Sequence, residues 1–248
     1  MRNDRRRVYL IDEIRGLSII LMVFYHAFFM LGHFFEVELL AKAQVFFKPL
    51  QPFFACLFIF ISGISSNLSR SNFKRGIRLL GIALGFTLVT AVILPRFDIT
   101  GAEIYFGILH LLSVSMLLYA LLKKPLSKLP TNSGILVSLL LFSVTFSVQS
   151  GRLLWIELPR GIYELGFLSP LGFPGKGFYS ADYFPVLPYI FMFFAGTFFG
   201  RLAEKDALPQ SWYVSRCKPL SAIGKKTLII YILHWPIIFL LGLIISKF

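Results

Sequence analysis

Residues 7–35 constrain this chain more than any other stretch, because their pattern is that of a membrane-spanning helix. The stretch opens with Asp12, Glu13 and Arg15 and continues with about twenty residues that are almost all apolar. At a rise of about 1.5 Å per residue, a helix of this length crosses a bilayer core of about 30 Å. The apolar part is too long for a signal peptide and no A-x-A cleavage pattern follows it. We therefore expect a retained transmembrane helix.

The ionisable side chains of this stretch share one helical face. Arg15 and His26 are eleven residues apart, close to three turns at about 3.6 residues per turn, and Asp12 and His33 fall on the same stripe. Arg15 is expected at the cytoplasmic boundary, with His26 roughly 16 Å deeper. A histidine at that depth faces protein or water, which favours a functional role. The alternative is a histidine that only hydrogen-bonds a neighbouring helix.

The composition extends the membrane interpretation to the whole chain. Of the 248 residues, 56% are hydrophobic and 28 are Phe, which excludes an ordinary soluble domain. A net charge of +13 would suggest nucleic acid for a soluble protein. Here the cations flank apolar segments and have another explanation, so no nucleic-acid partner is expected. Cys56 and Cys217 are poorly placed to pair, and no Cys/His spacing suits a metal, so neither a disulfide nor a metal site is predicted.

Hydropathy along the chain predicts an all-α fold, a polytopic integral membrane helical bundle of about seven transmembrane helices in a single domain over residues 1–248. Such a protein is a multi-pass protein of the cell membrane, with the lipid bilayer as its partner. The expected spans are 14–35, 52–68, 76–94, 104–122, 134–148, 185–202 and 227–245. An amphipathic helix in the membrane interface is expected at 36–51. A long outer loop covers 150–184, where prolines and glycines argue against regular structure, and a cytoplasmic loop covers 203–226.

The distribution of lysine and arginine predicts the orientation of this bundle. With the N-terminus inside, 18 of the 25 basic residues fall in inner segments and 7 in outer ones. This bias is typical of a cytoplasmic N-terminus and, with seven spans, an extracytoplasmic C-terminus. It also complicates the interpretation of Arg75 and Arg78. Guanidinium groups suit the phosphates of a nucleotide, but orientation alone accounts for these two arginines.

Three further polar side chains lie near or within the expected spans. His110 could bind an acceptor molecule or only pack between helices. His234 lies next to a break in hydrogen bonding, because Pro236 cannot donate to the carbonyl of Ile232, and it could line a site or be a satisfied core histidine. Asp182 is flanked by aromatic residues, a combination that suits a sugar but also an ordinary aromatic belt at the membrane interface.

Five segments resemble, in order, the heparan-α-glucosaminide N-acetyltransferase catalytic-domain family in its bacterial branch. They are IDEIRGLSIILMVFYH, FIFISGISSNL, IYFGILHLLSVSMLLY, SPLGFPGKGFYSADYFPVLPYIFMFFAG and YILHWPI. Arg15 and His26, separated by ten residues, also resemble the Arg/Lys-x10-His motif of the related acyltransferase family 3 proteins. The ISG at 61–63 resembles the second-helix signature of those proteins. The chain is shorter than the long members of either family.

The resemblance implies a membrane-embedded O- or N-acyltransferase that moves an acyl group, expected to be acetyl, from cytoplasmic acyl-CoA to an extracytoplasmic glycan or similar small acceptor. Histidine supplies a base near neutral pH or a covalent acyl carrier, and the sequence does not choose between these. The expected catalytic residues are His26, His33, Arg15 and Asp12. The expected donor-binding residues are Arg15, Arg75 and Arg78, although Arg15 could simply pair with Asp12. The expected acceptor-binding residues are Asp182, His110 and His234. A homo-oligomer is left open.

Two other classes of function compete with this interpretation. A proton-coupled small-molecule transporter would use His26 as a relay, although no paired broken helices or internal repeats support it. A non-catalytic membrane scaffold would need a larger partner to supply missing helices. A retinal protein is disfavoured because the final span has no lysine for a Schiff base.

Overall fold

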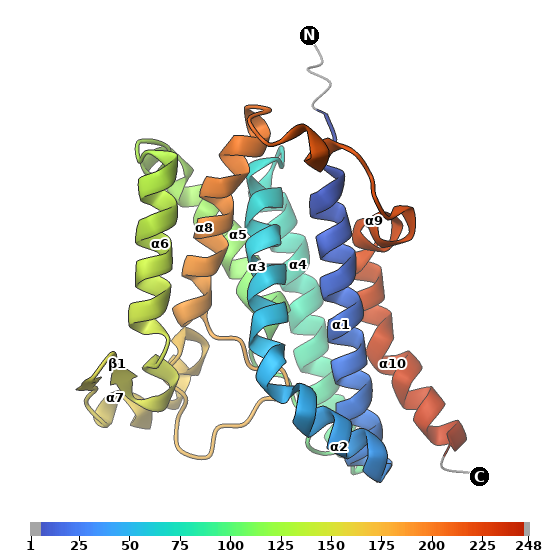
Figure 1. Ribbon diagram of the computed structural model, residues 1–248. Helices are drawn as coiled ribbons and strands as arrows, with labels where there is room; N and C mark the ends of the chain where they lie inside the picture. Colours follow the sequence, from blue (N-terminus) through green and yellow to red (C-terminus); the bar gives the residue numbers. More distant parts are fainter. Residues whose placement is uncertain (1–5, 246–248) are drawn as a thin grey trace. The chain divides into compact units, whose positions relative to one another are not determined.

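The computed structural model of the protein describes residues 6–245 (Figure 1). The chain divides into two compact units. Unit 1 comprises the chain up to Ile61 and from Asp206 onward, and unit 2 comprises Ser62–Lys205. The expectation of a single domain stays a prediction. Arg2, Arg5 and Lys247, which the charge distribution above includes, lie outside the described residues.

The expected all-α polytopic bundle is confirmed. Seven helical segments among the described residues are long and apolar enough to cross a membrane, which makes this a multi-pass membrane protein. These segments are Tyr9–Phe34, Glu38–Asn67, Asn72–Phe97, Ile108–Ser127, Thr131–Ser150, Val186–Glu204 and Thr227–Ile245. Large apolar side chains remain exposed along several of them, for example Ile229, Leu233 and Ile237 in the last segment. Such a surface is suited to contact with lipid.

Unit 1 is built around its first helix. Its helical elements are α1 (Tyr9–Phe34), α2 (Glu38–Phe47), η1 (Lys48–Leu50), the first part of α3 (Gln51–Asn67), η6 (Gln210–Tyr213), α9 (Lys218–Lys225) and α10 (Thr227–Ile245). Helix α1 packs against α2, α9 and α10 (Figure 1). Residues in the range 36–51 are helical, as expected for an interfacial helix there. This helix continues through η1 into α3. Pro49 does not interrupt this run, because it lies in the first turn of η1, where its missing N–H costs nothing.

Two short helices of unit 1, η6 and α9, were not predicted and lie in the expected loop 203–226. Helix α9 approaches α1 closely through two glycines. A Cβ atom on Gly224 would overlap the carbonyl oxygen of Asp12, and one on Gly16 would overlap the carbonyl oxygen of Leu220. The absence of side chains at these positions therefore lets the two backbones meet.

Unit 2 is organised around α5 and α8, which have the largest buried share among the membrane spans, 50% and 56%. Helix α4 packs on α5, and α6 packs on α8, which also contacts α5. The end of α3 meets α8 where Gly63 leaves room for the backbone of Phe193. The elements are α4 (Asn72–Thr87), η2 (Leu88–Ile93), η3 (Leu94–Phe97), α5 (Ile108–Ser127), α6 (Thr131–Thr145), η4 (Val148–Ser150), β1 (Arg152–Leu153), β2 (Ile156–Glu157), α7 (Gly161–Glu164), η5 (Gly166–Leu171) and α8 (Val186–Glu204).

The long loop of unit 2 is more ordered than expected at its start. Strands β1 and β2 pair antiparallel, and α7 and η5 follow them. The part at 172–185 has no regular structure, as predicted from its prolines and glycines. It runs beside the residues that precede α5, because the backbone N–H of Ala181 donates to the carbonyl oxygen of Glu103 at 2.8 Å.

Two predicted span boundaries differ from the structure for identifiable reasons. The third span begins at Asn72 rather than 76, because the side chain of Ser71 accepts a hydrogen bond from the N–H of Lys74 and caps the helix. The fourth begins at Ile108 rather than 104 and continues past Pro125 to Ser127. At that end, Arg201 donates to the carbonyl oxygens of Leu126 and Leu129, both at 2.7 Å.

Candidate active site

Two buried histidines of unit 1 lie against each other. His26 in α1 and His234 in α10 are 8% and 4% exposed, and their ring centroids are 5.2 Å apart. The ring of Trp235 lies 6.1 Å from that of His26. The two histidines are distant in sequence, but α1 and α10 pack together and bring them to one place. The sequence predicted both as site residues without predicting that they meet.

Hydrogen bonding determines which nitrogen of His234 can act as a base. Its Nδ1 atom lies 2.5 Å from the carbonyl oxygen of Tyr231. A carbonyl oxygen only accepts, so Nδ1 carries the proton and the Nε2 atom of the neutral ring holds the lone pair. The buried Nε2 of His234 and the buried Nδ1 of His26 have no hydrogen-bond partner among the described residues. The pair therefore contains an oriented imidazole with an unused basic nitrogen.

Arg15 and Asp12, at the start of α1, form an ion pair, with Nη1 of Arg15 3.0 Å from Oδ1 of Asp12. Asp12 also accepts from Nε of Arg7 at 2.7 Å, and Arg15 donates to the carbonyl oxygen of Gly224 at 3.4 Å. The interpretation of Arg15 as a partner of Asp12 agrees with these contacts. They also tie the beginning of α1 to α9. Donor binding by Arg15 stays a prediction.

Glu13 is a buried carboxylate that was not predicted as a site residue. Its Oε1 atom accepts from the hydroxyl of Ser215 at 2.8 Å and from the backbone N–H groups of Arg216 and Cys217 at 2.8 and 2.9 Å. These bonds attach the segment before α9 to α1. The sequence offered only a weak signal, a carboxylate at the edge of an apolar span, because its partners are remote in sequence.

His33 lies on the same helix as His26 but in different surroundings. Its side chain is exposed, and its ring stacks on that of Phe29 at 5.5 Å. The stripe on α1 that contains His26 and His33 is not buried along its whole length, because neighbouring helices cover only part of it. The catalytic role predicted for His33 stays a prediction.

In unit 2, His110 and Asp182 both bind the beginning of α5. Oδ2 of Asp182 accepts from the N–H of Ile108 at 2.9 Å, and Nδ1 of His110 accepts from the N–H of Gly107 at 3.2 Å. The Nε2 atom of His110 then carries the proton and donates to the hydroxyl of Thr87 at 3.2 Å. These contacts give both side chains a structural role. The acceptor-binding role predicted for them stays a prediction.

The predicted donor-binding arginines of α4 are both exposed. Arg75 donates through Nη1 to the carbonyl oxygen of Ser65 at 3.3 Å. Arg78 lies one turn further along the same helix. Neither the sequence nor these contacts separates phosphate binding from a role in orientation, so both assignments stay predictions.

Comparison with known proteins identifies the family. The family model described as the catalytic region of heparan-alpha-glucosaminide N-acetyltransferase matches residues 7–236. The chain belongs to this family. No curated protein and no solved structure matches the chain. The matched region contains α1 and the part of α10 up to Pro236, so both histidines of the pair lie within the family's domain.

Membership of the heparan-alpha-glucosaminide N-acetyltransferase family supports an acetyltransferase role and implies acetyl-CoA as the acetyl donor. Among the described residues, no group of three His, Cys, Asp or Glu side chains is placed to hold a metal ion. The candidate site offers two buried imidazole side chains to such a reaction.

Proposed function

We propose that this protein transfers an acetyl group from acetyl-CoA to an amine or hydroxyl group of a sugar or similar small acceptor, with His26 and His234 acting on the reacting groups. The observation that carries the proposal is the buried histidine pair, in which the hydrogen bond to Tyr231 leaves the Nε2 lone pair of His234 available. Membership of the acetyltransferase family supports the type of group transferred.

In the direct route, Nε2 of His234 takes a proton from the acceptor as the acceptor atom attacks the carbonyl carbon of the thioester. The carbon–sulfur bond breaks and coenzyme A leaves as a thiolate, which takes up a proton to become the free thiol. General base catalysis of this kind contributes about 10²–10⁴-fold to the rate. The carbonyl of Tyr231 keeps the imidazole in the required tautomer, as an orienting acceptor does in other histidine bases.

In the covalent route, a ring nitrogen of His26 attacks the thioester and carries the acetyl group as an acetyl-imidazole, releasing coenzyme A. The acceptor then attacks this acetyl group while His234 accepts its proton, and His26 is regenerated. The close approach of the two rings suits this division of roles. The two routes differ in one observable. Only the covalent route yields acetylated protein when acetyl-CoA is supplied without acceptor.

We also propose on which side of the membrane the donor and the acceptor bind. The distribution of basic residues and the chain's resemblance to the family favour a cytoplasmic donor and an extracytoplasmic acceptor, in the cell membrane. The family's name refers to a glucosaminide, which favours an amino sugar among the acceptors to be tried first. Binding of the acceptor by Asp182 and His110 stays part of this proposal, and it rests on the family resemblance rather than on their hydrogen bonds to the beginning of α5.

The test compares substitutions of three histidines in the purified full chain. His234→Asn retains an amide N–H that can donate to the carbonyl of Tyr231 but has no basic nitrogen, and His26→Ala removes the second imidazole. We expect both to fold and to bind acetyl-CoA while losing at least about 100-fold in turnover. His33→Asn tests the catalytic role predicted for this exposed histidine, and unchanged turnover would contradict that role. Phe24→Ala, at an exposed position of the same helix, is the control and should retain full turnover.

Folded yield, acetyl-CoA affinity and turnover are measured for each variant. Labelled acetyl-CoA provides the readout, both for transfer to acceptor and for acetyl bound to protein. Full turnover in a well-folded His26→Ala or His234→Asn protein would contradict the assignment of that histidine. No transfer to any amine or hydroxyl acceptor by the wild-type protein would contradict the proposed function.

A further inference from the structure

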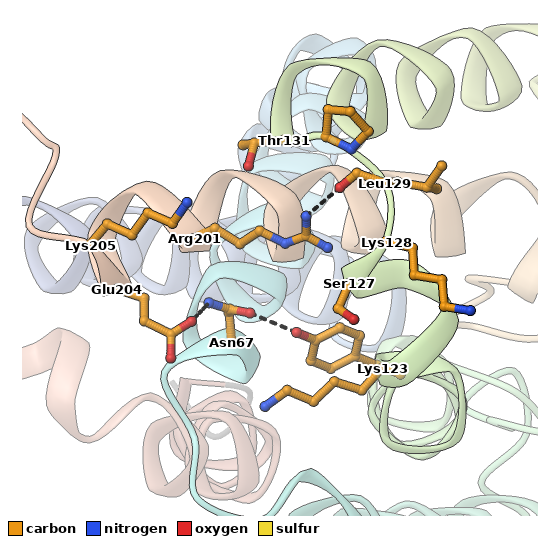
Figure 2. A pocket seen from close by; sticks show the side chains of 11 residues that line it. Asn67, Lys123, Ser127, Lys128, Leu129, Thr131, Arg201, Glu204 and Lys205 are labelled. Carbon is orange, nitrogen blue, oxygen red and sulfur yellow. Dashed lines mark hydrogen bonds between the residues drawn. The ribbon is translucent and has the colours of Figure 1, made fainter.

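Unit 2 contains a cleft of about 470 Å³ that none of the residues assigned to acetyl transfer lines. It lies among the ends of α3, α5 and α8 and the beginning of α6 (Figure 2). The predicted orientation places this end of unit 2 on the cytoplasmic side. Four cationic side chains, Lys123, Lys128, Arg201 and Lys205, and a single carboxylate, Glu204, line the cleft.

A chain of hydrogen bonds that begins at two buried side chains fixes one wall of the cleft. The hydroxyl of Tyr119 donates to Oδ1 of Asn67 at 2.7 Å, and Nδ2 of Asn67 donates to Oε2 of Glu204 at 2.8 Å (Figure 2). Tyr119 and Asn67 are 3% and 4% exposed. Because its carboxylate is held by Asn67, Glu204 belongs to the fixed wall of the cleft. The wall joins α3, α5 and α8.

Arg201 is a fixed part of the framework. Its Nη1 and Nη2 atoms donate to the carbonyl oxygens of Leu129 and Leu126, both at 2.7 Å, and its guanidinium lies 4.5 Å from the ring centre of Phe198. These contacts hold its charge at the turn between α5 and α6. The helix α6 begins there, and Pro130 at its N-cap provides no side-chain hydrogen bond. The partial positive charge of that helix end therefore adds to the charge of Arg201.

The three lysines complete the cationic lining. Figure 2 shows Lys123, Lys128 and Lys205 around the cleft. All three side chains are exposed, and none forms an ion pair with a described residue. A lysine ammonium is a flexible point charge with three donors, and several such groups around one concavity attract a multivalent anion.

Orientation of the membrane helices does not explain this arrangement by itself. The positive-inside rule depends on how many basic residues an inner segment carries and is indifferent to their grouping around a hollow. Lys124 shows the difference, because it follows Lys123 in α5 and serves orientation equally well without lining the cleft.

We propose that this cleft binds phosphate groups. The shared chemistry is a phosphate mono- or diester, which two sources can supply at this face, namely the nucleotide end of coenzyme A or the headgroup of an anionic phospholipid. Binding of the coenzyme A nucleotide rests on the proposed function, because coenzyme A carries the acetyl donor. Binding of a lipid headgroup goes beyond it and holds whether or not acetyl transfer occurs.

The test measures binding by the purified full chain in nanodiscs. The cleft variant carries Lys123→Gln, Lys128→Gln and Lys205→Gln. The control variant carries Lys74→Gln, Lys124→Gln and Lys218→Gln, which removes the same charge from exposed positions outside the cleft. The probes are coenzyme A, dephospho-coenzyme A without the 3′-phosphate, and phosphatidylglycerol against phosphatidylcholine as nanodisc lipid. Thermal midpoints show whether each variant is folded.

We expect the cleft variant to bind a phosphate probe at least about 100-fold more weakly than the wild type, and the control to change by less than about threefold. If coenzyme A loses affinity and dephospho-coenzyme A binds the wild type more weakly, the nucleotide is the source. If phosphatidylglycerol stabilises the wild type but not the cleft variant, the lipid is the source. Equal losses in both variants, or no loss for any probe, would overturn the proposal.

These outcomes are separate from those of the transfer assay. A protein that binds phosphate in the cleft but transfers no acetyl group contradicts only the proposed function. A transfer-active protein whose binding of every probe survives the three cleft substitutions contradicts only the phosphate site.

Discussion

At the scale of single residues, the buried histidines His110 and His234 differ in how many of their ring nitrogens form hydrogen bonds. In His110, Nδ1 accepts from Gly107 and Nε2 donates to Thr87, so both nitrogens are occupied. In His234 only Nδ1 is occupied. A nitrogen that already holds the framework cannot remove a proton from a substrate without breaking that contact. We therefore assign the base to His234 rather than to His110.

The hydrogen bond that Asp182 accepts at the beginning of α5 can be tested by substitution. Its carboxylate is buried and accepts from the N–H of Ile108 at the first turn of α5, a charge-assisted bond near the positive end of the helix. Asp182→Ala should lower the free energy of unfolding by about 1.5–3 kcal/mol, because the amide is left without its acceptor. Asp182→Asn should lose less, since an amide oxygen accepts the same bond.

Thermal or denaturant unfolding in detergent measures the effect, with Lys176→Ala as a control in the exposed part of the same loop. If Asp182 also orients the acceptor, Asp182→Asn will raise the KM for acceptor while leaving acetyl-CoA binding intact. A stable Asp182→Ala protein would contradict the capping role.

The sequence predicted candidate site residues but not how they are grouped. His26 and His234 stand out because an ionisable residue at membrane depth is costly. Their contact depends on the packing of α1 on α10, and no periodicity within one helix reports on a partner about two hundred residues away. The hydrogen bonds of Glu13 were missed for the same reason.

At the scale of elements, the long apolar spans were predictable and the short helices were not. The last span, 227–245, matches α10 at both ends because uniform hydropathy defines it. Helix α9 is short and partly polar, so its sequence resembles that of a loop. It is helical because it packs on α1, and tertiary packing of this kind is invisible to local propensity.

The close contact between α1 and α9 can be tested by adding a Cβ atom at Gly224. Because a Cβ on Gly224 would overlap the carbonyl oxygen of Asp12, Gly224→Ala must separate the two helices. We expect a loss of at least about 1–3 kcal/mol in the free energy of unfolding, as for overpacking of a core. The matched control is Gly81→Ala in α4, where an added Cβ meets nothing within 4 Å.

Both variants are measured by the same unfolding assay. The control should be neutral or slightly more stable, since alanine favours helix over glycine by up to about 1 kcal/mol. Equal stability of the Gly224→Ala protein and the wild type would show that α9 does not pack on α1 in the membrane.

At the scale of the whole molecule, the two ends of the membrane helices carry different chemistry. The ends expected to be cytoplasmic carry most of the lysines and arginines, including those of the phosphate cleft. The opposite ends carry exposed aromatic side chains in unit 2, such as Trp155 and Phe167. Basic residues on the inner side and aromatic residues near an interface are the features that orient membrane helices.

The last prediction tests this orientation directly. Of the 25 basic residues, 18 fall on one predicted side, so a reporter near Asp206 should be cytoplasmic and one fused after Phe248, which lies outside the described residues, should be extracytoplasmic. Insertions at Leu129, between α5 and α6, and at Trp155, between β1 and β2, supply the inner and outer controls. Reporters at Asp206 and Phe248 that agree with each other would mean that α10 does not cross the membrane. Since α10 carries His234, that result would also remove the histidine pair from the membrane interior, and the proposed mechanism would fall with it.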